Sequence, residues 1–390
     1  MIQAVGVGTF VSYGVFFHAF IEEFQWSRAA ISGASSLALF LSGLLAIAVG
    51  RLNDIYGPRL LMGISAVFFG AGLLLTSQVQ EIWQLYLFYG IVFGIGLSGV
   101  DIIALTTTAR WFSSSRGVMT GIVKVGTGAG QFSIPFLAGL LIAAGGWRMT
   151  NVMLGGFSLI VLFFLSRVLR RDPGDATESS SSTLSGKKAT GASFRDKVGM
   201  SAGEAMRTAQ MLIICSVNFL LVFTLLTILV HVVPHSSDLG LSAIKSAGVL
   251  STIGAVSMVG RLTCGLYIDR VGSRTVMIVC CFILISSLLW LQVADSLWML
   301  YFFAGVYGLA HGGIFTAISP IVAETFGIAA HGTLFGLVVF SGTTGGALGP
   351  LVAGQMFDTF GSYTIMFWII TSMSCSGLGL ILLLKPIKRI

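Results

Sequence analysis

The sequence predicts an all-α membrane protein whose twelve transmembrane helices form two six-helix bundles that repeat one another. Three observations predict this fold. Of the 390 residues 55% are hydrophobic and only 9% are charged, whereas soluble domains carry about 25% charged residues. Apolar stretches close to the ~20 residues that span a bilayer recur along the chain. The two halves of the sequence also match each other. A soluble enzyme and a nucleic-acid-binding protein are therefore excluded.

The apolar stretches define the predicted spans in chain order. They lie near residues 2–21, 31–51, 60–78, 82–108, 116–141, 149–169, 209–233, 243–265, 275–294, 297–321, 332–355 and 363–385. The first stretch has no basic segment before it and no small-residue cleavage site after it, so we expect a retained helix and not a signal peptide.

One long polar segment separates the sixth span from the seventh. Residues 170–207 are rich in serine, glycine and charged residues, and such a segment cannot bury enough apolar surface to fold alone. We therefore expect an N-terminal six-helix bundle at residues 1–169, a linker at 170–207 and a C-terminal six-helix bundle at 208–390.

The positions of the basic residues predict the orientation in the membrane. Seventeen lysines and arginines lie on the side that holds both termini and the linker, and three lie on the other side. Basic residues accumulate in cytoplasmic loops. The sequence thus predicts a multi-pass protein of the cell (inner) membrane with cytoplasmic termini. The net charge of +7 reflects this orientation, and no nucleic-acid partner is expected.

An internal repeat relates the two halves. When the chain is shifted so that Gly50 falls on Gly265, many positions coincide without a gap, and Asp54, Gly57 and Arg59 then fall on Asp269, Gly272 and Arg274. We call this displacement the repeat shift. It moves the chain by six spans and preserves orientation, so the halves are parallel repeats. Transporters that rock two bundles around a central site are built in this way.

Several motifs resemble one family. The segment 50–59, after the second span, resembles the cytoplasmic signature loop of the major facilitator superfamily, and 265–274 resembles its second copy. Further segments are similar to the monocarboxylate and oxalate/formate branch: Tyr13–Phe17, Glu23–Ala29, Arg110–Gly130, Pro135, Gly146–Arg148, and Arg261 in the eighth span. The resemblance implies the major facilitator fold. It also implies that Asp54, Arg59, Asp269 and Arg274, within the signature loops, tie helix ends together in one access state. The alternative for the two arginines is anchoring on the cytoplasmic side.

Three charged residues remain inside the spans once the loop ends are removed: Asp101, Lys124 and Arg261. Each lies roughly 12–14 Å from the cytoplasmic edge at 1.5 Å per residue, and His311 is similarly central. None is matched in the other half of the repeat. Because a charge at such a depth is costly, these residues predict a functional site.

The residue types predict an anion site. Arg261 can hold a carboxylate through two hydrogen bonds, and an arginine here also fits the family resemblance. Lys124 would act as a point charge, or would neutralise Asp101 on the adjacent helix. Asp101 is the candidate for proton coupling, the alternative being a static counter-ion. Further candidates for substrate binding, each with helix packing as its alternative, are His311, Asn218, Tyr13 and Tyr307.

These features predict a secondary active transporter. Its expected activity is proton-coupled symport of a short monocarboxylate of the lactate/pyruvate class by alternating access, in which a proton on Asp101 frees Lys124 to share the anion with Arg261. An oxalate/formate-type antiporter and a non-transporting nutrient sensor are the alternatives. We expect a monomer without enzymatic activity, cofactor or metal. The five cysteines lie in apolar runs and are expected to be buried free thiols.

Overall fold

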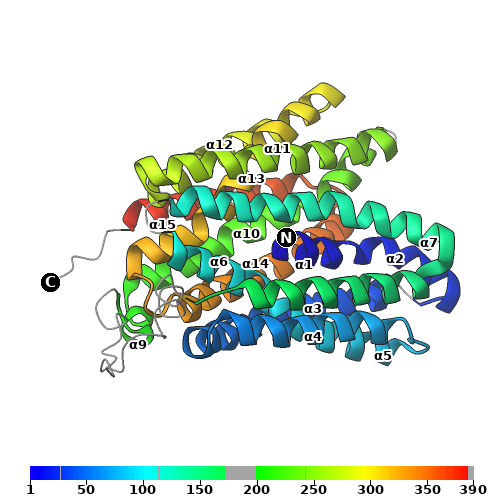
Figure 1. The fold of residues 1–390 in the computed structure, drawn as a ribbon. Coiled ribbons are helices and arrows are strands. Elements are labelled where there is room, and N and C mark those ends of the chain that lie inside the picture. The colour runs from blue at the N-terminus through cyan, green and yellow to red at the C-terminus, as the bar shows by residue number, and fades with distance from the viewer. Residues whose placement is uncertain (27, 113–114, 172–198, 242, 385–390) are drawn as a thin grey trace, which may run out of the picture. The chain divides into compact units, whose positions relative to one another are not determined.

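The computed structural model describes residues 1–26, 28–112, 115–171, 199–241 and 243–384. Long helices joined by short turns make up most of this part of the chain (Figure 1). Eleven of the helical segments described are long and apolar enough to cross a membrane. The predicted linker at 170–207 falls mostly outside the described residues.

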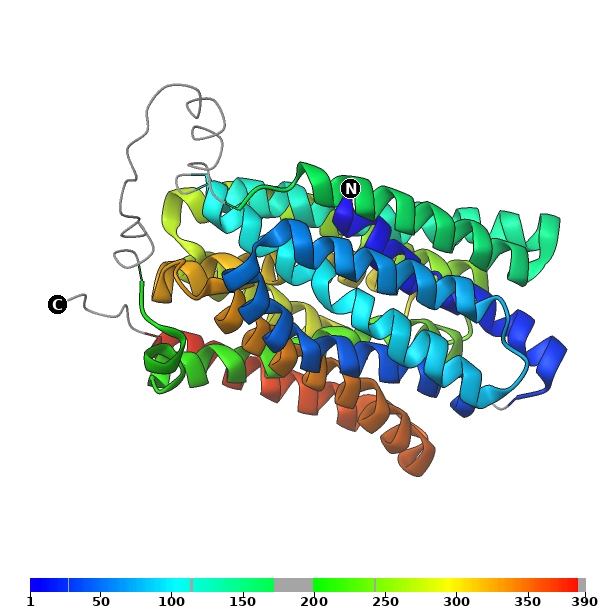
Figure 2. The same cartoon turned by 60° about the horizontal axis from the view of Figure 1, so that its bottom comes forward.

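The first half of the chain contains six predicted spans. It folds into α1 (Ile2–Val11), α2 (Tyr13–Phe24), α3 (Arg28–Tyr56), α4 (Pro58–Thr76), α5 (Ile82–Leu85), η1 (Tyr86–Phe93), α6 (Gly94–Trp111) and α7 (Arg116–Val168). The first span consists of α1 and α2 with a turn at Ser12 between them, whose hydroxyl donates to the carbonyl of Thr9 at 2.7 Å. The blue-to-cyan helices α3, α4 and α6 pack together (Figure 2).

The segment labelled α7 holds the fifth and sixth predicted spans, separated by a tight turn at Gly146. Its two membrane-spanning segments are Arg116–Ile142 and Ala144–Val168, and the helix is kinked at Gly146, where φ is 78°. Glycine adopts this left-handed conformation at no steric cost. The change of direction between the two spans therefore occurs at one residue.

The second half contains the other six predicted spans. It folds into α9 (Ala202–Met206), α10 (Ala209–Asp238), α11 (Ala243–Val271), α12 (Ser273–Leu291), α13 (Leu297–Phe326), α14 (His331–Phe360) and α15 (Thr364–Leu383). Helices α11 and α12 run side by side (Figure 1). The predicted all-helical fold is confirmed.

The repeat is visible in the backbone as well as in the sequence. Gly57 and Gly272 have φ values of 84° and 85°, and Gly146 and Gly361 have values of 78° and 66°. The repeat shift relates the two members of each pair. Both halves therefore place their sharp turns at equivalent positions, as the predicted parallel repeat requires.

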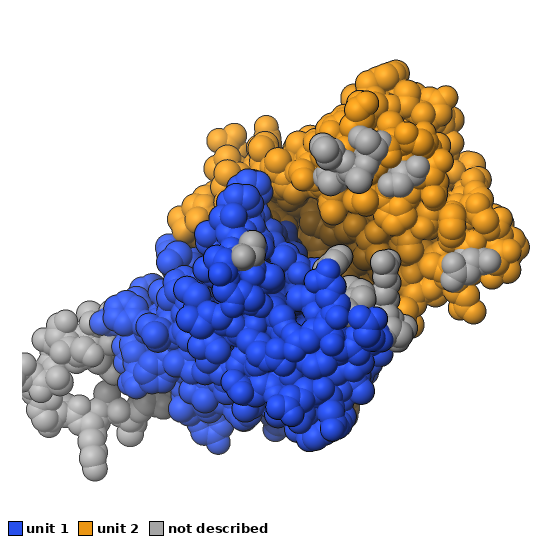
Figure 3. Space-filling model, turned by 90° about the vertical axis from the view of Figure 1, so that its right-hand side faces the viewer, with its two compact units in different colours: residues 1–113, 129–206, 326–336 blue, residues 114–128, 207–325, 337–390 orange. Residues whose placement is uncertain are grey.

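The contacts within the chain define two compact units (Figure 3). The first unit contains Met1–Ser113, Ala129–Met206 and Phe326–Gly336, and the second contains Ser114–Gly128, Arg207–Thr325 and Leu337–Ile390. Each unit thus includes the beginning of one helix, α14 or α7, from the other half of the sequence. The domain boundaries at residues 169 and 208 stay a prediction.

The end of the first unit that is predicted to lie outside is held by an ion pair. Arg148 donates to the carboxylate of Glu23 at 2.5 Å and to the carbonyl of Val79 at 3.2 Å. Trp147 donates to the same carboxylate at 2.5 Å, and the guanidinium lies 4.3 Å from the ring centroid of Trp147. These contacts link α2, α7 and the turn after α4.

This ion pair should make the first unit weakly sensitive to acid. Burial raises the pKa of Glu23, but the hydrogen bonds from Trp147 and Arg148 outweigh it and hold that pKa below its ordinary value of 4.5. A lowered pKa in the folded state gives stability that is present above pH 4.5 and is lost as the pH falls through the folded-state pKa. We expect the thermal midpoint of Glu23→Gln to vary less below pH 4.5 than that of the unsubstituted protein. Glu22 is exposed, and Glu22→Gln serves as the control. The prediction would be contradicted if the thermal midpoints of Glu23→Gln and of the unsubstituted protein varied equally with pH below 4.5.

Candidate functional site

Arg261 on α11 is buried against α7 within the second unit. Its side chain is 2% exposed, and Nη1 donates to the main-chain carbonyl of Lys124 at 3.1 Å. The two helices approach closely because Gly121 has no side chain: a Cβ there would lie 2.6 Å from the carbonyl oxygen of Arg261. The structure thus brings together two of the three charged residues that the sequence places inside the spans.

His311 on α13 lies near the same guanidinium. The imidazole of His311 interacts electrostatically with the Arg261 guanidinium. His311 is 6% exposed. Its Nδ1 atom is buried and has no hydrogen-bond partner among the described residues. An unsatisfied buried polar atom costs about 1–3 kcal/mol. This nitrogen therefore marks a place where a polar ligand or a water molecule would be stabilised. Gly312 allows the approach, because a Cβ there would lie 2.9 Å from the amide nitrogen of Arg261.

Two cationic side chains are buried in the candidate site. Lys124 is 5% exposed and Arg261 2% exposed, and the main-chain carbonyl of one accepts a hydrogen bond from the other. Charges in such an environment interact strongly because the dielectric constant is low. An anion is therefore the kind of ligand that this part of the second unit is suited to bind.

Asp101 on α6 accepts a hydrogen bond from α1 within the first unit. The side-chain amide of Gln3 on α1 donates to Oδ1 of Asp101 at 2.6 Å and to the carbonyl of Val100 at 3.4 Å. Gln3 is 1% exposed. The predicted pairing of Asp101 with Lys124 stays a prediction, since the two residues belong to different units.

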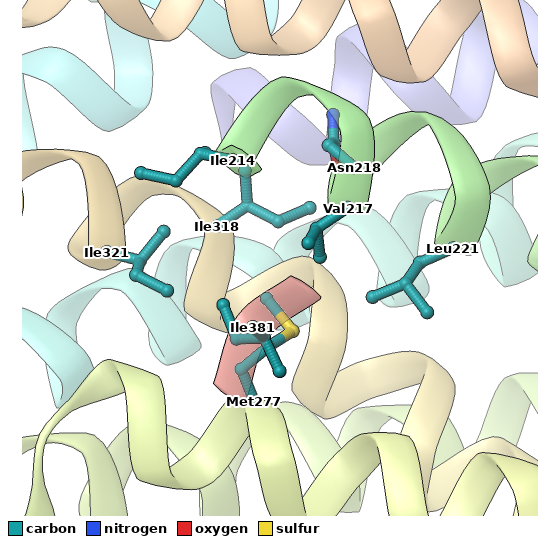
Figure 4. A pocket seen from close by; sticks show the side chains of 8 residues that line it. All are labelled: Ile214, Val217, Asn218, Leu221, Met277, Ile318, Ile321 and Ile381. Carbon is teal, nitrogen blue, oxygen red and sulfur yellow. The ribbon is translucent and has the colours of Figure 1, made fainter. Parts of the chain in front are cut away.

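Gln3 was not among the residues predicted from sequence, although the repeat carries a signal for it. At the repeat shift Gln3 falls on Asn218, so both halves begin with a helix that carries a buried carboxamide. Asn218 donates to the carbonyl of Val338 at 2.6 Å. It lies at the edge of a small apolar cavity of about 10 Å³ in the second unit (Figure 4).

The hydroxyl groups of the two candidate tyrosines donate hydrogen bonds to main-chain carbonyls of the protein. Tyr13 donates to the carbonyl of Ile31 at 2.8 Å, and Tyr307 donates to that of Leu225 at 2.7 Å. Both side chains are buried. These bonds hold neighbouring helices together and favour the packing role, while the predicted contact of each tyrosine with substrate stays a prediction. The ring of Tyr307 lies 6.0 Å from that of His311.

Asp54 binds the first turn of α14 inside the first unit. Its carboxylate accepts hydrogen bonds from the amides of Gly332 and Thr333 at 3.1 and 3.0 Å and from the Thr333 hydroxyl at 3.1 Å. Arg110 forms an ion pair with it at 2.5 Å. The carboxylate thus satisfies main-chain donors that a helix N-terminus leaves unpaired, and its negative charge complements the helix dipole.

Asp269 makes the equivalent contact in the second unit. It accepts hydrogen bonds from the amides of Gly117 and Val118, in the first turn of α7, at 2.6 and 3.0 Å. The repeat shift relates Asp54 to Asp269, Gly332 to Gly117 and Thr333 to Val118. Arg110 falls on Thr325, so the arginine of the Asp54 contact has no counterpart at the equivalent position. Gly265 permits the approach, since a Cβ there would lie 2.7 Å from the carbonyl of Gly117. Gly50 packs in the same way against Gly332.

The other signature-loop residues fix the neighbouring turns. Arg59 donates to the carbonyl of Leu169 at 2.9 Å, and Arg274 donates to that of Leu382 at 2.8 Å. Gly57 directly precedes α4 and Gly272 directly precedes α12, and both have a positive φ in the left-handed region. In both signature loops the arginine therefore donates to a main-chain carbonyl at the end of the last span of its half, although the acceptors are not at equivalent positions of the repeat.

Residues of metal-ligand type do not gather into one site in the part of the chain described here. Groups of three or more His, Cys, Asp or Glu side chains placed to hold a metal ion are absent from it.

Membrane-spanning helices arranged as a repeat, with charged residues buried inside them, define a multi-pass membrane transporter. The model of the Major Facilitator Superfamily matches residues 2–285 and 256–389. The chain belongs to the Major Facilitator Superfamily, as the signature loops predict.

Similar proteins agree with this assignment. The chain is 25% identical over 385 residues to monocarboxylate transporter 13 of Rattus norvegicus, covering 98% of this chain and 86% of the relative. It is 24% identical over 375 residues to the uncharacterized MFS-type transporter YcxA of Bacillus subtilis, covering 93% and 88%. The proton:xylose symporter XylE has the same fold, with a TM-score of 0.75 at 13% identity over 98% of this chain and 94% of that one. The human organic anion transporter MFSD10 gives a TM-score of 0.73 at 15% identity, over 97% and 98%.

Proposed function

We propose that the chain carries a short monocarboxylate of the lactate/pyruvate class together with a proton, by alternating access. The observation that carries this proposal is the burial of Arg261 against the main chain of Lys124. A guanidinium can hold a carboxylate through two parallel hydrogen bonds, and bound anion would offset the cost of keeping these cations inside a membrane span. Relatives that are named monocarboxylate transporters support the substrate class.

In the proposed cycle Asp101 takes up the proton. Its hydrogen bond from Gln3 stabilises the ionised carboxylate, so loss of that charge on protonation would weaken the contact between α1 and α6. The protonated acid leaves the positive charge of Lys124 and Arg261 to be balanced by the anion. The added proton and the anion cancel, so the loaded carrier has the same net charge at its centre as the empty one and moves no additional charge between access states.

The helix-end contacts have a place in the same cycle. We assign the Asp54–α14 and Asp269–α7 contacts to the cytoplasmic side, where the basic residues accumulate, and to the state in which that side is closed. The remaining proposals are a cell-membrane location, cytoplasmic termini and activity as a monomer.

Uptake of radiolabelled lactate into proteoliposomes tests the proposed function. An inward proton gradient should accelerate uptake, and unlabelled pyruvate should compete more strongly than oxalate or formate. An oxalate/formate-type exchanger would instead take up label only against internal anion and would leave the pH gradient intact. Binding of lactate without uptake, either under a proton gradient or against internal anion, would favour the nutrient sensor and contradict transport.

Asp101→Asn separates proton coupling from substrate binding. Because asparagine carries no titratable proton, we expect lactate-driven alkalinisation of the medium to disappear in this variant, while exchange of internal for external lactate persists. Proton flux is measured with a pH dye and exchange with labelled lactate. Asp295→Asn, in the exposed turn between α12 and α13, is the matched control. Proton flux equal to that of the unsubstituted protein would remove Asp101 from the mechanism.

A further inference from the structure

Two cysteine thiols meet inside the second unit. The Sγ atoms of Cys264 on α11 and Cys280 on α12 lie 3.7 Å apart. Cys280 is buried and Cys264 is half-buried. The prediction that all five cysteines are buried holds for Cys280 and Cys281 and is wrong for Cys375, which is exposed, while Cys215 and Cys264 are half-buried.

A glycine on a third helix faces both sulfur atoms. A Cβ at Gly313 on α13 would lie 2.6 Å from the Sγ of Cys264 and would also overlap the Sγ of Cys280. Any side chain at this position would push the sulfurs apart or displace the helix. The three helices therefore leave a space in which the two thiols are neighbours.

The thiol pair is specific to one half of the repeat. At the repeat shift Cys264, Cys280 and Gly313 fall on Val49, Ser65 and Ser98. The buried charged residues Lys124 and Arg261 break the repeat in the same way. A feature that only one half carries is not required by the shared scaffold.

We propose that Cys264 and Cys280 form a dithiol site that binds one trivalent arsenic atom. Soft thiolate ligands prefer soft, thiophilic centres, and two adjacent sulfurs can bind the same atom. With an organoarsenic oxide, R–As=O, two As–S bonds form and the arsenic–oxygen bond breaks. The two thiol protons leave with the oxygen as water, so no oxidant or reductant is needed.

The site is linked to Arg261 through the helix that both occupy. Cys264 follows Arg261 by three residues on α11, a spacing that places side chains near each other on a helix surface. An arsenic bridge would join α11 covalently to α12 and restrict movement of the segment that carries Arg261. Bound arsenic therefore arrests transport. This second statement rests on the proposed function.

Arsenic capture is tested with phenylarsine oxide on the purified, detergent-solubilised full chain. Intact mass should show one phenylarsenic group per chain, with two of the five thiols lost to titration. A dithiol such as 2,3-dimercaptopropanol should reverse the reaction at concentrations at which a monothiol does not. Cys375→Ser, at the exposed cysteine, should retain capture, whereas Cys264→Ser and Cys280→Ser should lose it.

Gly313→Ala provides a variant that keeps every thiol. If the two sulfurs act together, the added methyl group should raise the phenylarsine oxide concentration needed for half-maximal capture at least tenfold. Equal capture by Cys264→Ser and the unsubstituted protein, or equal reversal by monothiol and dithiol, would overturn the dithiol site.

Lactate uptake tests the second statement separately. Phenylarsine oxide should block uptake by the unsubstituted protein and spare Cys264→Ser. Uninhibited uptake by protein that carries arsenic would overturn the arrest. Normal arsenic capture by protein that takes up no lactate before treatment would count against the proposed function and leave the dithiol site intact.

Discussion

Arg261→Ala is expected to reduce proton-driven lactate uptake by on the order of 100-fold, because truncating one partner of a buried charge pair costs about 2–5 kcal/mol. Arg261→Lys should recover little of this loss. A lysine ammonium keeps the charge but lacks the planar fork that binds a carboxylate through two hydrogen bonds. Initial rates over a range of lactate concentrations measure both effects.

Two controls separate binding from folding in this experiment. Arg270 lies on the same helix but is exposed, so Arg270→Ala should leave the uptake rate close to that of the unsubstituted protein. Arg261 also donates to the carbonyl of Lys124, so thermal unfolding of each variant shows whether loss of this bond alone changes the amount of folded protein. Full uptake by Arg261→Ala would refute the anion site described above.

Asp54→Ala is expected to lower the free energy of unfolding by about 3–5 kcal/mol, the usual cost of removing one member of a buried ion pair. The Arg110 side chain is only 6% exposed, and the substitution leaves its guanidinium without this carboxylate. The amides of Gly332 and Thr333 lose their acceptor at the same time. Denaturant titration in mixed micelles, followed by uptake in proteoliposomes, measures the effect.

The repeat supplies the matched control for this prediction. Asp269 is exposed although it makes the equivalent contact, so Asp269→Ala should cost about 1 kcal/mol, as loss of a helix cap usually does. In a double-mutant cycle, Asp54→Ala combined with Arg110→Ala should cost less than the sum of the two single changes. Equal costs for Asp54→Ala and Asp269→Ala would contradict the difference in burial.

The spans and the repeat could be predicted because both are properties of the linear sequence. Membrane helices need long apolar stretches, and the repeat shift is read directly from matching letters. The break between the fifth and sixth spans was predicted, but the turn at Ser12 and the position of the turn at Gly146 were not, since hydropathy over a long window does not register a change of direction at one residue. The π-helical segment η1, Tyr86–Phe93, was missed for the same reason.

The partners of the buried polar residues were harder to predict. Sequence spacing gives the depth of Asp101 and Arg261 in the membrane, but it does not say which neighbouring helix each one faces. The bond from Gln3 to Asp101 joins residues 98 positions apart, and that from Arg261 to Lys124 joins residues 137 positions apart. Helix packing determines these pairs, and a glycine such as Gly121 decides how closely two helices can approach.

The two aspartate contacts differ in how much must be broken to separate them. Around Asp54 a guanidinium, two amides and a hydroxyl all have to exchange their bonds for water, in a buried setting. At Asp269 the carboxylate is exposed, and it accepts two amide hydrogen bonds and interacts electrostatically with Arg116. The helix pairs α3–α14 and α7–α11 therefore have unequal barriers to separation, and water arriving from the proposed cytoplasmic side would part α7 from α11 before α14 from α3. A carrier built from two equivalent halves would in this way open in a fixed order.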